Sequence, residues 1–317
     1  GMGLTQISSG MYSNNNYTSL ERSHHIGLIK THSFDNLITD SAAAGTAMSS
    51  GTKTYNRVVG MDENFSPVKS ILEILRDKGY MTAIIATSTI VHATPASYYS
   101  KVKSRYEYDE IASQLSKSNI NFFVGGGEKH FNDRRDKRNL INEMDDYLFA
   151  NNLESFIKIN SNKIGFLTNY DDPIGKHEGR EPSLEDMVQA TLQKLSSFNK
   201  PFFLLVEGSQ IDWGGHDNDS EHLISEMLEF DRTVGVVFDF AKKDKNTTVV
   251  ITADHETGGV SIVDGNLEDS KVVNEYVSED HTGTMVPIFS FGPYSSLFNG
   301  IYDNTEIFDK LEAIIIK

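Results

Sequence analysis

The sequence predicts an α/β protein, a three-layer sandwich in which helices cover both faces of a central, mostly parallel, doubly wound sheet. Helix-like and strand-like segments alternate along the chain, which is the order typical of a parallel sheet. The strand-like segments are short and apolar throughout, as expected of strands that are covered on both faces. Since the sequence contains neither an internal repeat nor a linker, we expect residues 1–317 to form a single domain.

The first elements begin after a segment that lacks a regular pattern. Residues 1–17 are rich in Gly, Ser and Asn and are expected to form a loop. Ser66-Pro67 is expected to open a helix that Gly79 ends, because apolar residues between them recur at helical spacing. The apolar segment at residues 81–86 is expected to form a strand. Helix followed by strand is half of a βαβ unit.

Three consecutive glycines follow the next strand. A helix is expected at residues 108–115 and a strand at residues 121–124, which runs into Gly125-Gly126-Gly127. The glycines would suit a phosphate-binding loop, but the Lys-Ser/Thr pair of that motif is missing, and a tight turn is favoured. The dense charges at residues 133–139 predict a solvated face.

The rest of the chain continues the alternation of helix and strand. Ser183 resembles the start of a capping box, although Asp186 replaces the usual Glu, and an apolar stripe continues behind it. Further elements are expected as a strand at residues 201–206 that is buried on both faces, a helix at 220–241, strands at 248–252 and 286–291, and a last helix capped by Asn304. This order completes the doubly wound pattern.

Composition excludes several classes of function. The net charge of −16 argues against nucleic acid or an anionic membrane as a partner, because phosphate groups attract Lys and Arg patches. An acidic enzyme that handles phosphate needs bound cations to reverse the negative charge around its substrate. The composition therefore favours a metal-dependent enzyme over a metal-free one. The absence of Cys excludes disulfides, Cys-based zinc sites and thiol catalysis. No apolar run is long enough for a transmembrane helix, and no signal peptide is expected.

One short segment combines an acid, a serine and a run of small residues. Asp40 and Ser41 precede the small residues of the segment at residues 39–47, which places the serine near a helix N-terminus. Free N–H groups and the helix dipole favour an anion there, and we interpret Ser41 as a nucleophile beside an oxyanion. The alternative is a tightly packed Ala-rich helix with Asp40 as its N-cap.

Acidic and His side chains follow two of the apolar strands. Glu207 ends the strand at 201–206, Asp212 and His216 are expected in the loop after it, and Asp254 and His255 end the strand at 248–252. Carboxyl ends of parallel strands meet at one edge of a sheet, so these side chains are expected to converge. Asp and His suit zinc, whereas the oxygen ligands Thr94 and Glu207 suit magnesium. Taken singly, each could instead be a capping acid or a hydrogen-bonded core His.

The other histidines are less informative. His281 precedes the strand at 286–291, and nothing in the local sequence directs it to the site. The seven histidines outside these patterns, such as His24, His25 and His130, are expected on the surface.

These segments together resemble the alkaline phosphatase family. The stretches DSAAAGTA at residues 40–47 and GTKTYN at residues 51–56 look like the nucleophile segment of that family. The stretch VEGSQIDWGGH at residues 206–216 is similar to its metal segment, and TADHETGG at residues 252–259 with HTG at residues 281–283 completes the set. The resemblance covers nearly the whole chain in the order of the family and implies an alkaline-phosphatase-like fold.

The resemblance implies a role for each matching residue. Ser41 would be the nucleophile that becomes phosphoserine, and Arg105 would hold the phosphate. The implied ligands are Asp212, His216 and His281 for a first zinc, Asp254 and His255 with Ser41 for a second zinc, and Thr94 and Glu207 for magnesium. His92 stands where some members have Asp, and Trp213 replaces a Lys found in some members. Both changes remove groups that shape the surroundings of magnesium and phosphate.

One departure from the family concerns the start of the chain. The first strand of the family ends in Asp-Gly-Met-Gly, and its Asp bridges the second zinc and the magnesium, whereas this sequence starts at Gly1-Met2-Gly3. We therefore expect a domain that is N-terminally truncated relative to the family, with weak or absent metal at the second zinc site.

The expected function is hydrolysis of small phosphomonoesters through a phosphoserine at Ser41, with two zincs and one magnesium. Two alternatives remain: a related metallohydrolase that acts on diesters or sulfates, and a metal-poor binding protein. The resemblance also implies a homodimer in the periplasm or outside the cell.

Overall fold

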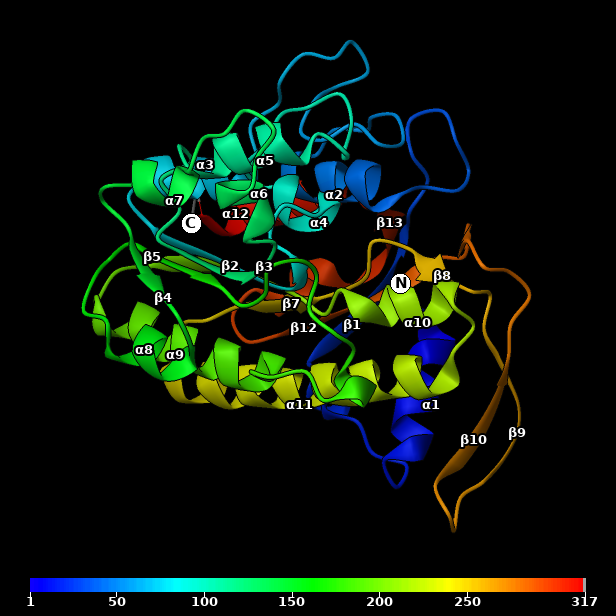
Figure 1. The fold of residues 1–317 in the computed structure, drawn as a ribbon. Helices are drawn as coiled ribbons and strands as arrows, with labels where there is room; N and C mark the ends of the chain where they lie inside the picture. Colours follow the sequence, from blue (N-terminus) through cyan, green and yellow to red (C-terminus); the bar gives the residue numbers. More distant parts are fainter. Residues whose placement is uncertain (316–317) are drawn as a thin grey trace.

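The computed structural model describes residues 1–315, in which two larger sheets lie between layers of helices and two further sheets have two strands each (Figure 1). The first sheet has five parallel strands in the order β4-β5-β3-β2-β6. Their bounds are β4 Leu148–Ala150, β5 Ile164–Leu167, β3 Phe122–Gly126, β2 Met81–Thr89 and β6 Phe202–Glu207. Parallel strands joined through helices confirm the predicted α/β class.

The second sheet is mixed and has four strands in the order β13-β1-β12-β7. Its strands are β13 Gly300–Asp303, β1 His25–Lys30, β12 Val286–Phe291 and β7 Val249–Ile251. The β1–β13 pair is parallel, whereas β12 is antiparallel to both β1 and β7. The strands predicted for one central sheet are thus divided between two sheets.

The division changes the environment of β6. In the described part of the chain, β6 ends one sheet and β7 ends the other, and each pairs along one edge only. All six residues of β6 are half-buried, whereas every residue of the central strand β2 is buried. The prediction that residues 201–206 are buried on both faces is therefore wrong, because an edge strand lacks one neighbour.

Helices cover both sides of the five-stranded sheet, as Figure 1 shows. One layer contains α2 Ser41–Ser50, α3 Ile71–Asp77, α4 Ala93–Ala96, α5 Tyr108–Leu115, α6 Lys129–Asn132, α7 Leu140–Glu143 and α12 Glu306–Ile315. The other contains α8 Leu153–Lys158, α9 Leu184–Ser197 and α11 Ser220–Asp244. Alternate residues of β2 enter different cores: Ile84 packs under the first layer and Ile85 under the second. A third core lies between α11 and the second sheet.

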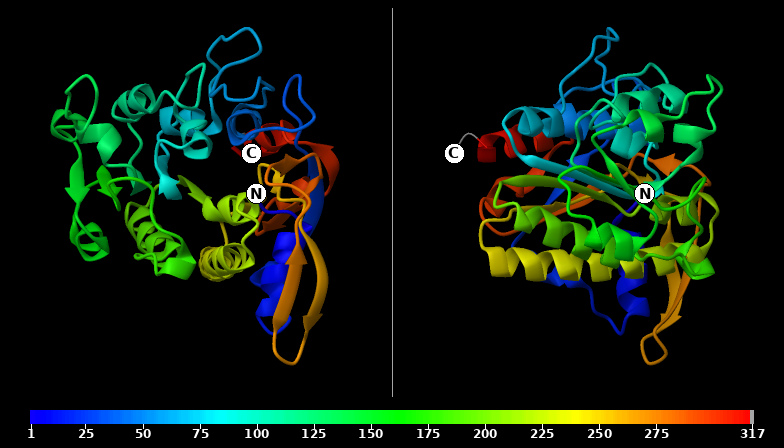
Figure 2. Two further views of the ribbon diagram at one scale, coloured as in Figure 1. Left: turned by 45° about the vertical axis from the view of Figure 1, so that its right-hand side comes forward. Right: turned by 60° about the vertical axis from the view of Figure 1, so that its left-hand side comes forward.

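The expected N-terminal loop is wrong: Leu4–Ser13 forms helix α1. Its side chains Gln6 and Ile7 are buried, and α1 packs against α11. The same helix contacts the hairpin of β9 Ser261–Asn266 and β10 Lys271–Glu275, which projects from the body of the molecule (Figure 2). Burial against two partners outweighs the poor helix propensity of a Gly- and Ser-rich segment.

Other predicted elements differ mainly at their ends. The helix expected from Ser66-Pro67 begins only at Ile71, because Ser70 caps it by accepting a hydrogen bond from Glu73 N. The strand expected at residues 81–86 continues to Thr89. The charged segment at residues 133–139 is mostly exposed, but Arg134 is buried, where it pairs with Asp136. The prediction of a wholly solvated face is therefore wrong at Arg134.

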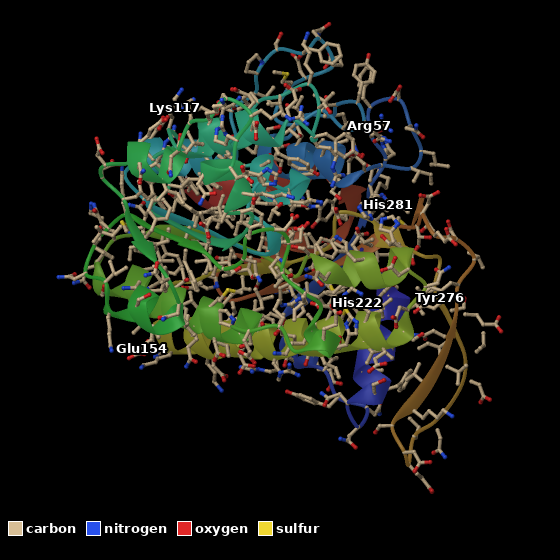
Figure 3. All side chains as sticks on the ribbon, viewed as in Figure 1. Arg57, Lys117, Glu154, His222, Tyr276 and His281 are labelled. Carbon is tan, nitrogen blue, oxygen red and sulfur yellow. The ribbon has the colours of Figure 1, made fainter. Side chains whose placement is uncertain are left out.

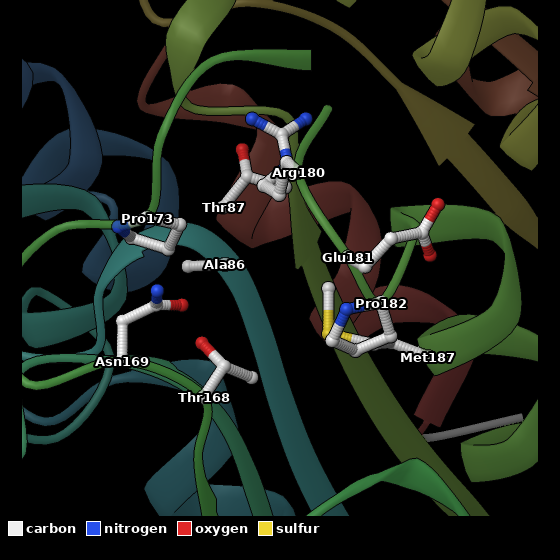
Figure 4. Close-up of a pocket in the computed structure, with 9 residues that line it drawn as sticks. All are labelled: Ala86, Thr87, Thr168, Asn169, Pro173, Arg180, Glu181, Pro182 and Met187. Carbon is white, nitrogen blue, oxygen red and sulfur yellow. The ribbon is translucent and has the colours of Figure 1, made fainter. Parts of the chain in front are cut away.

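Helix α11 is held to the loop before α9 by a buried ion-pair network. The Arg180 guanidinium donates to both oxygens of Glu226, each at 2.7 Å, and also to Glu229. All three side chains are almost inaccessible to solvent. Arg180 also lines a small pocket beside β2, shown in Figure 4, which contains none of the predicted site residues and to which we assign no function.

We expect Arg180→Met to lower the free energy of unfolding by about 3–5 kcal/mol, because the buried Glu226 would lose its guanidinium partner and Glu229 would keep only Lys176, whose Nζ lies 3.3 Å from Glu229 Oε1. Urea unfolding of the intact chain measures the change. The control is Arg232→Met, since Arg232 pairs with Glu185 at 3.4 Å on the surface and should contribute less than about 1 kcal/mol. Equal effects of the two substitutions would contradict the prediction.

Candidate functional site

Helix α2 begins at Ser41, where the sequence predicts a nucleophile. Asp40 is the N-cap and accepts a hydrogen bond from Ala43 N at 3.0 Å. The small residues bring α2 against α4: a Cβ added at Gly45 would lie 2.6 Å from Ser97 Oγ. The packed helix with Asp40 as its cap is thus present. It also carries a buried serine at its N-terminus, so the two interpretations of this segment do not exclude each other.

A first group of side chains comes from three segments. Asp212 and His216 lie on α10 Gln210–His216, and His281 begins β11 His281–Thr282. One ligand atom from each lies within 4.8 Å of the others, and we call this group the Asp212 cluster. His281 reaches it because β11 pairs with β8 Glu256–Thr257, a contact that its local sequence does not predict. Figure 3 labels His281 at the end of the molecule where Figure 1 shows β8 and α10.

The two imidazoles of the Asp212 cluster are oriented for a cation. His216 Nδ1 contacts the carbonyl of Glu279, and His281 Nδ1 contacts the carbonyl of Thr39 at 2.8 Å. A carbonyl only accepts, so each Nδ1 donates, and each neutral ring carries a lone pair on Nε2. The two Nε2 atoms lie 3.0 Å apart, and Asp212 carboxylate oxygens lie 3.4 Å and 3.6 Å from them. Converging lone pairs at this distance require a proton or a metal ion, so the donor set fits zinc.

The pKa values of the Asp212 cluster agree with this arrangement. The hydrogen bond that His216 donates to Asp212 raises the pKa of His216 to about 9, although burial opposes it. Burial, with the nearby charge of His255, lowers the pKa of His281 to about 4. The two rings therefore differ in proton affinity, and His216 rather than His281 holds a proton in this cluster.

A second group lies beside the first, and we call Ser41, Asp254 and His255 the Asp254 cluster. Ser41 Oγ lies 3.3 Å from His255 Nε2, which lies 3.0 Å from Asp254 Oδ2. The rings of His255 and His281 stack with centroids 3.4 Å apart, so the two clusters share a wall. The Gly1 ammonium lies 3.0 Å from Asp254 Oδ1. The structure thus brings Ser41, Asp254 and the Asp212 cluster into one site, as the sequence predicts, although β6 and β7 end in two different sheets rather than at one edge of a single parallel sheet.

The predicted oxygen ligands Thr94 and Glu207 are also close to this site. Thr94 Oγ1 is buried and lies beside the Glu207 carboxylate, without the geometry of an ordinary hydrogen bond. Burial raises the pKa of Glu207 to about 7, and the interactions with the Ser209 and Thr94 hydroxyls oppose the shift. A buried hydroxyl beside a buried carboxylate is a pair of oxygen ligands that fits a cation such as magnesium.

Arg105 is held beside the serine helix by residues outside the metal clusters. Its Nη1 lies 3.1 Å from Asp40 Oδ2, and its Nη2 lies 3.4 Å from His92 Nε2. Asp40 Oδ2 also accepts from Arg57 N, and Arg105 N donates to Arg57 O, which fixes the loop. Burial and the Arg105 charge lower the pKa of His92 to about 4. The rings of His92 and Trp213 contact each other edge-on, with centroids 6.2 Å apart.

Several polar residues around the clusters were not singled out from the sequence. Gln6, Glu256, Thr257 and Thr282 are hydrogen-bonded to one another or to the ligands. Apart from the adjacency of Glu256 and Thr257 to His255, no local pattern marks them. His222, expected on the surface, is buried, where its Nε2 lies 3.2 Å from Gln210 Oε1.

Together, the fold and this site define a hydrolase of the α/β class with candidate metal sites at the ends of its strands. The family model for alkaline phosphatase matches residues 3–275. The chain therefore belongs to the alkaline phosphatase family, as the sequence motifs indicate. In the described residues, no helix has the length and apolar character needed to cross a membrane.

Curated relatives and solved structures agree with the family. The chain is 33% identical to alkaline phosphatase 4 of Bacillus subtilis (88% of this chain, 77% of the relative). It is 35% identical to alkaline phosphatase 3 of the same organism (85% and 75%). The alkaline phosphatase of the Antarctic bacterium TAB5 has a TM-score of 0.95 and 39% identity over 99% of this chain and 95% of that one. A histidine-to-glutamate variant of the TAB5 enzyme, with magnesium in its M3 site, has a TM-score of 0.93 and 37% identity over 99% and 94%.

Proposed function

We propose that this chain hydrolyses small phosphomonoesters through a phosphoserine at Ser41, with two zinc ions and one magnesium ion. The observation that carries the proposal is the position of the Ser41 hydroxyl. It begins helix α2, lies 3.3 Å from His255 Nε2, and is adjacent to Asp40, which pairs with Arg105. A nucleophile, an anion-binding helix end and a guanidinium thus adjoin the candidate metal ligands.

The ligand sets follow from the donor atoms. The Asp212 cluster would hold the first zinc, the Asp254 cluster the second zinc, and Thr94 with Glu207 the magnesium. When bound, these cations supply Lewis acidity, which favours the ionised serine and the departing oxygen and activates water.

The side chains of this chain then have separate tasks. Ser41 Oγ forms a bond to phosphorus while the bond from phosphorus to the alcohol oxygen breaks, and water later cleaves the phosphoserine to release phosphate. The planar fork of Arg105 can bind two non-bridging oxygens, and Asp40 orients that fork. The free N–H groups at the start of α2 favour the same anion.

Arg105 also favours a monoester over a diester or a sulfate. A phosphomonoester dianion presents more charge to the guanidinium and the metal ions than a monoanionic diester or sulfate does. We therefore expect p-nitrophenyl phosphate to give a higher kcat/KM than bis-p-nitrophenyl phosphate or p-nitrophenyl sulfate, by at least about 10–100-fold. Faster turnover of the diester or the sulfate would contradict the proposal and favour the alternative hydrolase.

The two zinc sites are not equivalent in their protein ligands. The first set has one carboxylate and two imidazoles, whereas the second has one carboxylate, one imidazole and the Ser41 hydroxyl. We expect dialysed protein to retain zinc at the first site and to lose it from the second, because a hydroxyl is the weaker ligand. Elemental analysis after dialysis tests this expectation, and full occupancy of all three sites would contradict it.

His92 offers a substitution that should strengthen magnesium binding. It is half-buried, its buried Nδ1 has no hydrogen-bond partner in the described residues, and it precedes α4, which contains Thr94. We expect His92→Asp to raise magnesium affinity about tenfold or more, because it adds an oxygen ligand and a negative charge. Magnesium titration measures the change.

The control for His92→Asp is His24→Asp, which adds the same charge at an exposed position and should leave magnesium affinity unchanged. An unchanged affinity in His92→Asp, or an equal rise in His24→Asp, would contradict the role of His92. The homodimer and the location outside the cytoplasm that the resemblance implies stay predictions.

A further inference from the structure

The strands that carry or adjoin two of the metal-ligating histidines are too short to stabilise themselves. β8 and β11 contain two residues each and pair antiparallel, Thr257 with His281 and Glu256 with Thr282. His281 lies in β11, and His255 directly precedes β8. Since even longer two-stranded hairpins are marginally stable in water, other contacts must hold this ribbon in register.

The side chain of Glu256 supplies those contacts. It is buried and accepts hydrogen bonds from Gln6 Nε2 at 2.6 Å and from the hydroxyl of Thr282. The backbone N–H groups of Gly259 and Val260, each at 3.2 Å, complete its shell. One carboxylate therefore ties together helix α1, the turn after β8 and the strand β11. All four of these donors are neutral, so these hydrogen bonds fix the relative positions of the three segments and do not neutralise the Glu256 charge.

The same network continues into the Asp212 cluster. Gln6 Nε2 also donates to the carbonyl of Thr257 at 2.8 Å. The Thr257 hydroxyl donates to Asp212 Oδ1 and lies 3.2 Å from His255 Nδ1. A shift of Glu256 would therefore move β11, which carries His281. It would also move Thr257, whose hydroxyl contacts both Asp212 and His255.

We propose that Glu256 is a positioning residue for the first metal site: by binding Thr282 and Gln6 it sets the distance between His281 and the α10 ligands Asp212 and His216. This inference rests on the proposed function, because it takes the Asp212 cluster as a zinc site. Hydrogen-bonded neighbours of metal ligands typically change metal affinity 10–100-fold when they are removed.

Thr282 gives the sharpest test, because its hydroxyl can be removed without a change of size. We expect Thr282→Val and Glu256→Gln to weaken zinc binding at the first site about 10–100-fold, whereas Thr282→Ser, which keeps the hydroxyl, should stay within about threefold of the parent chain. Zinc affinity is measured on the intact, metal-stripped chain by competition with a chromogenic chelator. The absorption of bound Co²⁺ provides a second readout, of ligand geometry.

A matched control separates positioning from simple loss of stability. Thr191→Val removes a buried hydroxyl that donates to Met187 O in α9, away from the site, and should lower stability without a change in zinc affinity. Zinc affinities of Thr282→Val and Glu256→Gln equal to that of the parent chain would overturn the inference, and so would an equal loss in Thr191→Val. If Glu256→Gln fails to fold, the comparison of Thr282→Val with Thr282→Ser tests the inference, and equal zinc affinities of these two variants would overturn it. A parent chain that binds no zinc would instead overturn the proposed function together with this inference.

Discussion

Replacement of Ser41 by Ala is expected to abolish the phosphoenzyme and to lower kcat by about 10³–10⁶-fold, the range for loss of a catalytic nucleophile. The reason is geometric: Ser41 Oγ, 3.3 Å from His255 Nε2, is the hydroxyl at the N-terminus of α2. Acid quenching of the enzyme with ³²P-labelled substrate measures the covalent species. Zinc at the first site should change little, because the Asp212 cluster keeps its donor atoms.

The control for this experiment lies in the same helix. Ser49 is buried in α2, and its hydroxyl donates to Ser97 O at 2.9 Å. Ser49→Ala should lower stability modestly and leave the phosphoenzyme intact. Labelled phosphoprotein recovered from Ser41→Ala would assign the nucleophile to another residue.

Metal removal is expected to have the second large effect. Chelation followed by dialysis should lower kcat/KM about 10²–10⁴-fold, since bound cations contribute several kcal/mol to transition-state stabilisation. Zinc should restore the activity. Turnover that survives complete metal removal, verified by elemental analysis, would rule out the proposed mechanism.

The same experiment has a defined pH dependence. In metal-stripped protein, the hydrogen bond that His216 donates to Asp212 raises the pKa of His216 to about 9. Zinc requires the deprotonated ring, so its apparent affinity should rise by up to about tenfold per pH unit below pH 9 and level off above it. Asp212→Asn should weaken zinc binding and shift this dependence to lower pH. The exposed neighbour Asp217 serves as the control, and Asp217→Asn should change neither property.

Much of the site was predictable because its residues lie in short, dense segments. Asp212 and His216 are four residues apart, and Asp254 and His255 are adjacent. Both pairs follow apolar strands, which is why their convergence was expected. The structure corrects two details: Asp212 and His216 lie on helix α10 instead of a loop, and the two strands belong to different sheets. Ser41 was recognisable from the capping Asp40 and the small residues after it.

The remaining contacts gave no local signal. Gln6 and Glu256 are separated by 250 positions along the chain, and their hydrogen bond depends on packing of α1 that composition argued against. The division of the strands into two sheets, with β6 half-buried at an edge, likewise depends on which strands pair. Strand pairing is a property of distant segments, and the hydrophobicity of one segment does not specify its neighbour.

Local chemistry therefore accounts for the class of fold, most helices and strands, the capped serine helix and the identity of the candidate ligands, because caps, spacing and apolar runs act over a few residues. Only the tertiary structure places His281 beside Asp212, sets Arg105 against Asp40 and joins Glu256 to Gln6 and Thr282. Those contacts join residues far apart in the sequence, and they exist only once the cores have packed and brought the loops together.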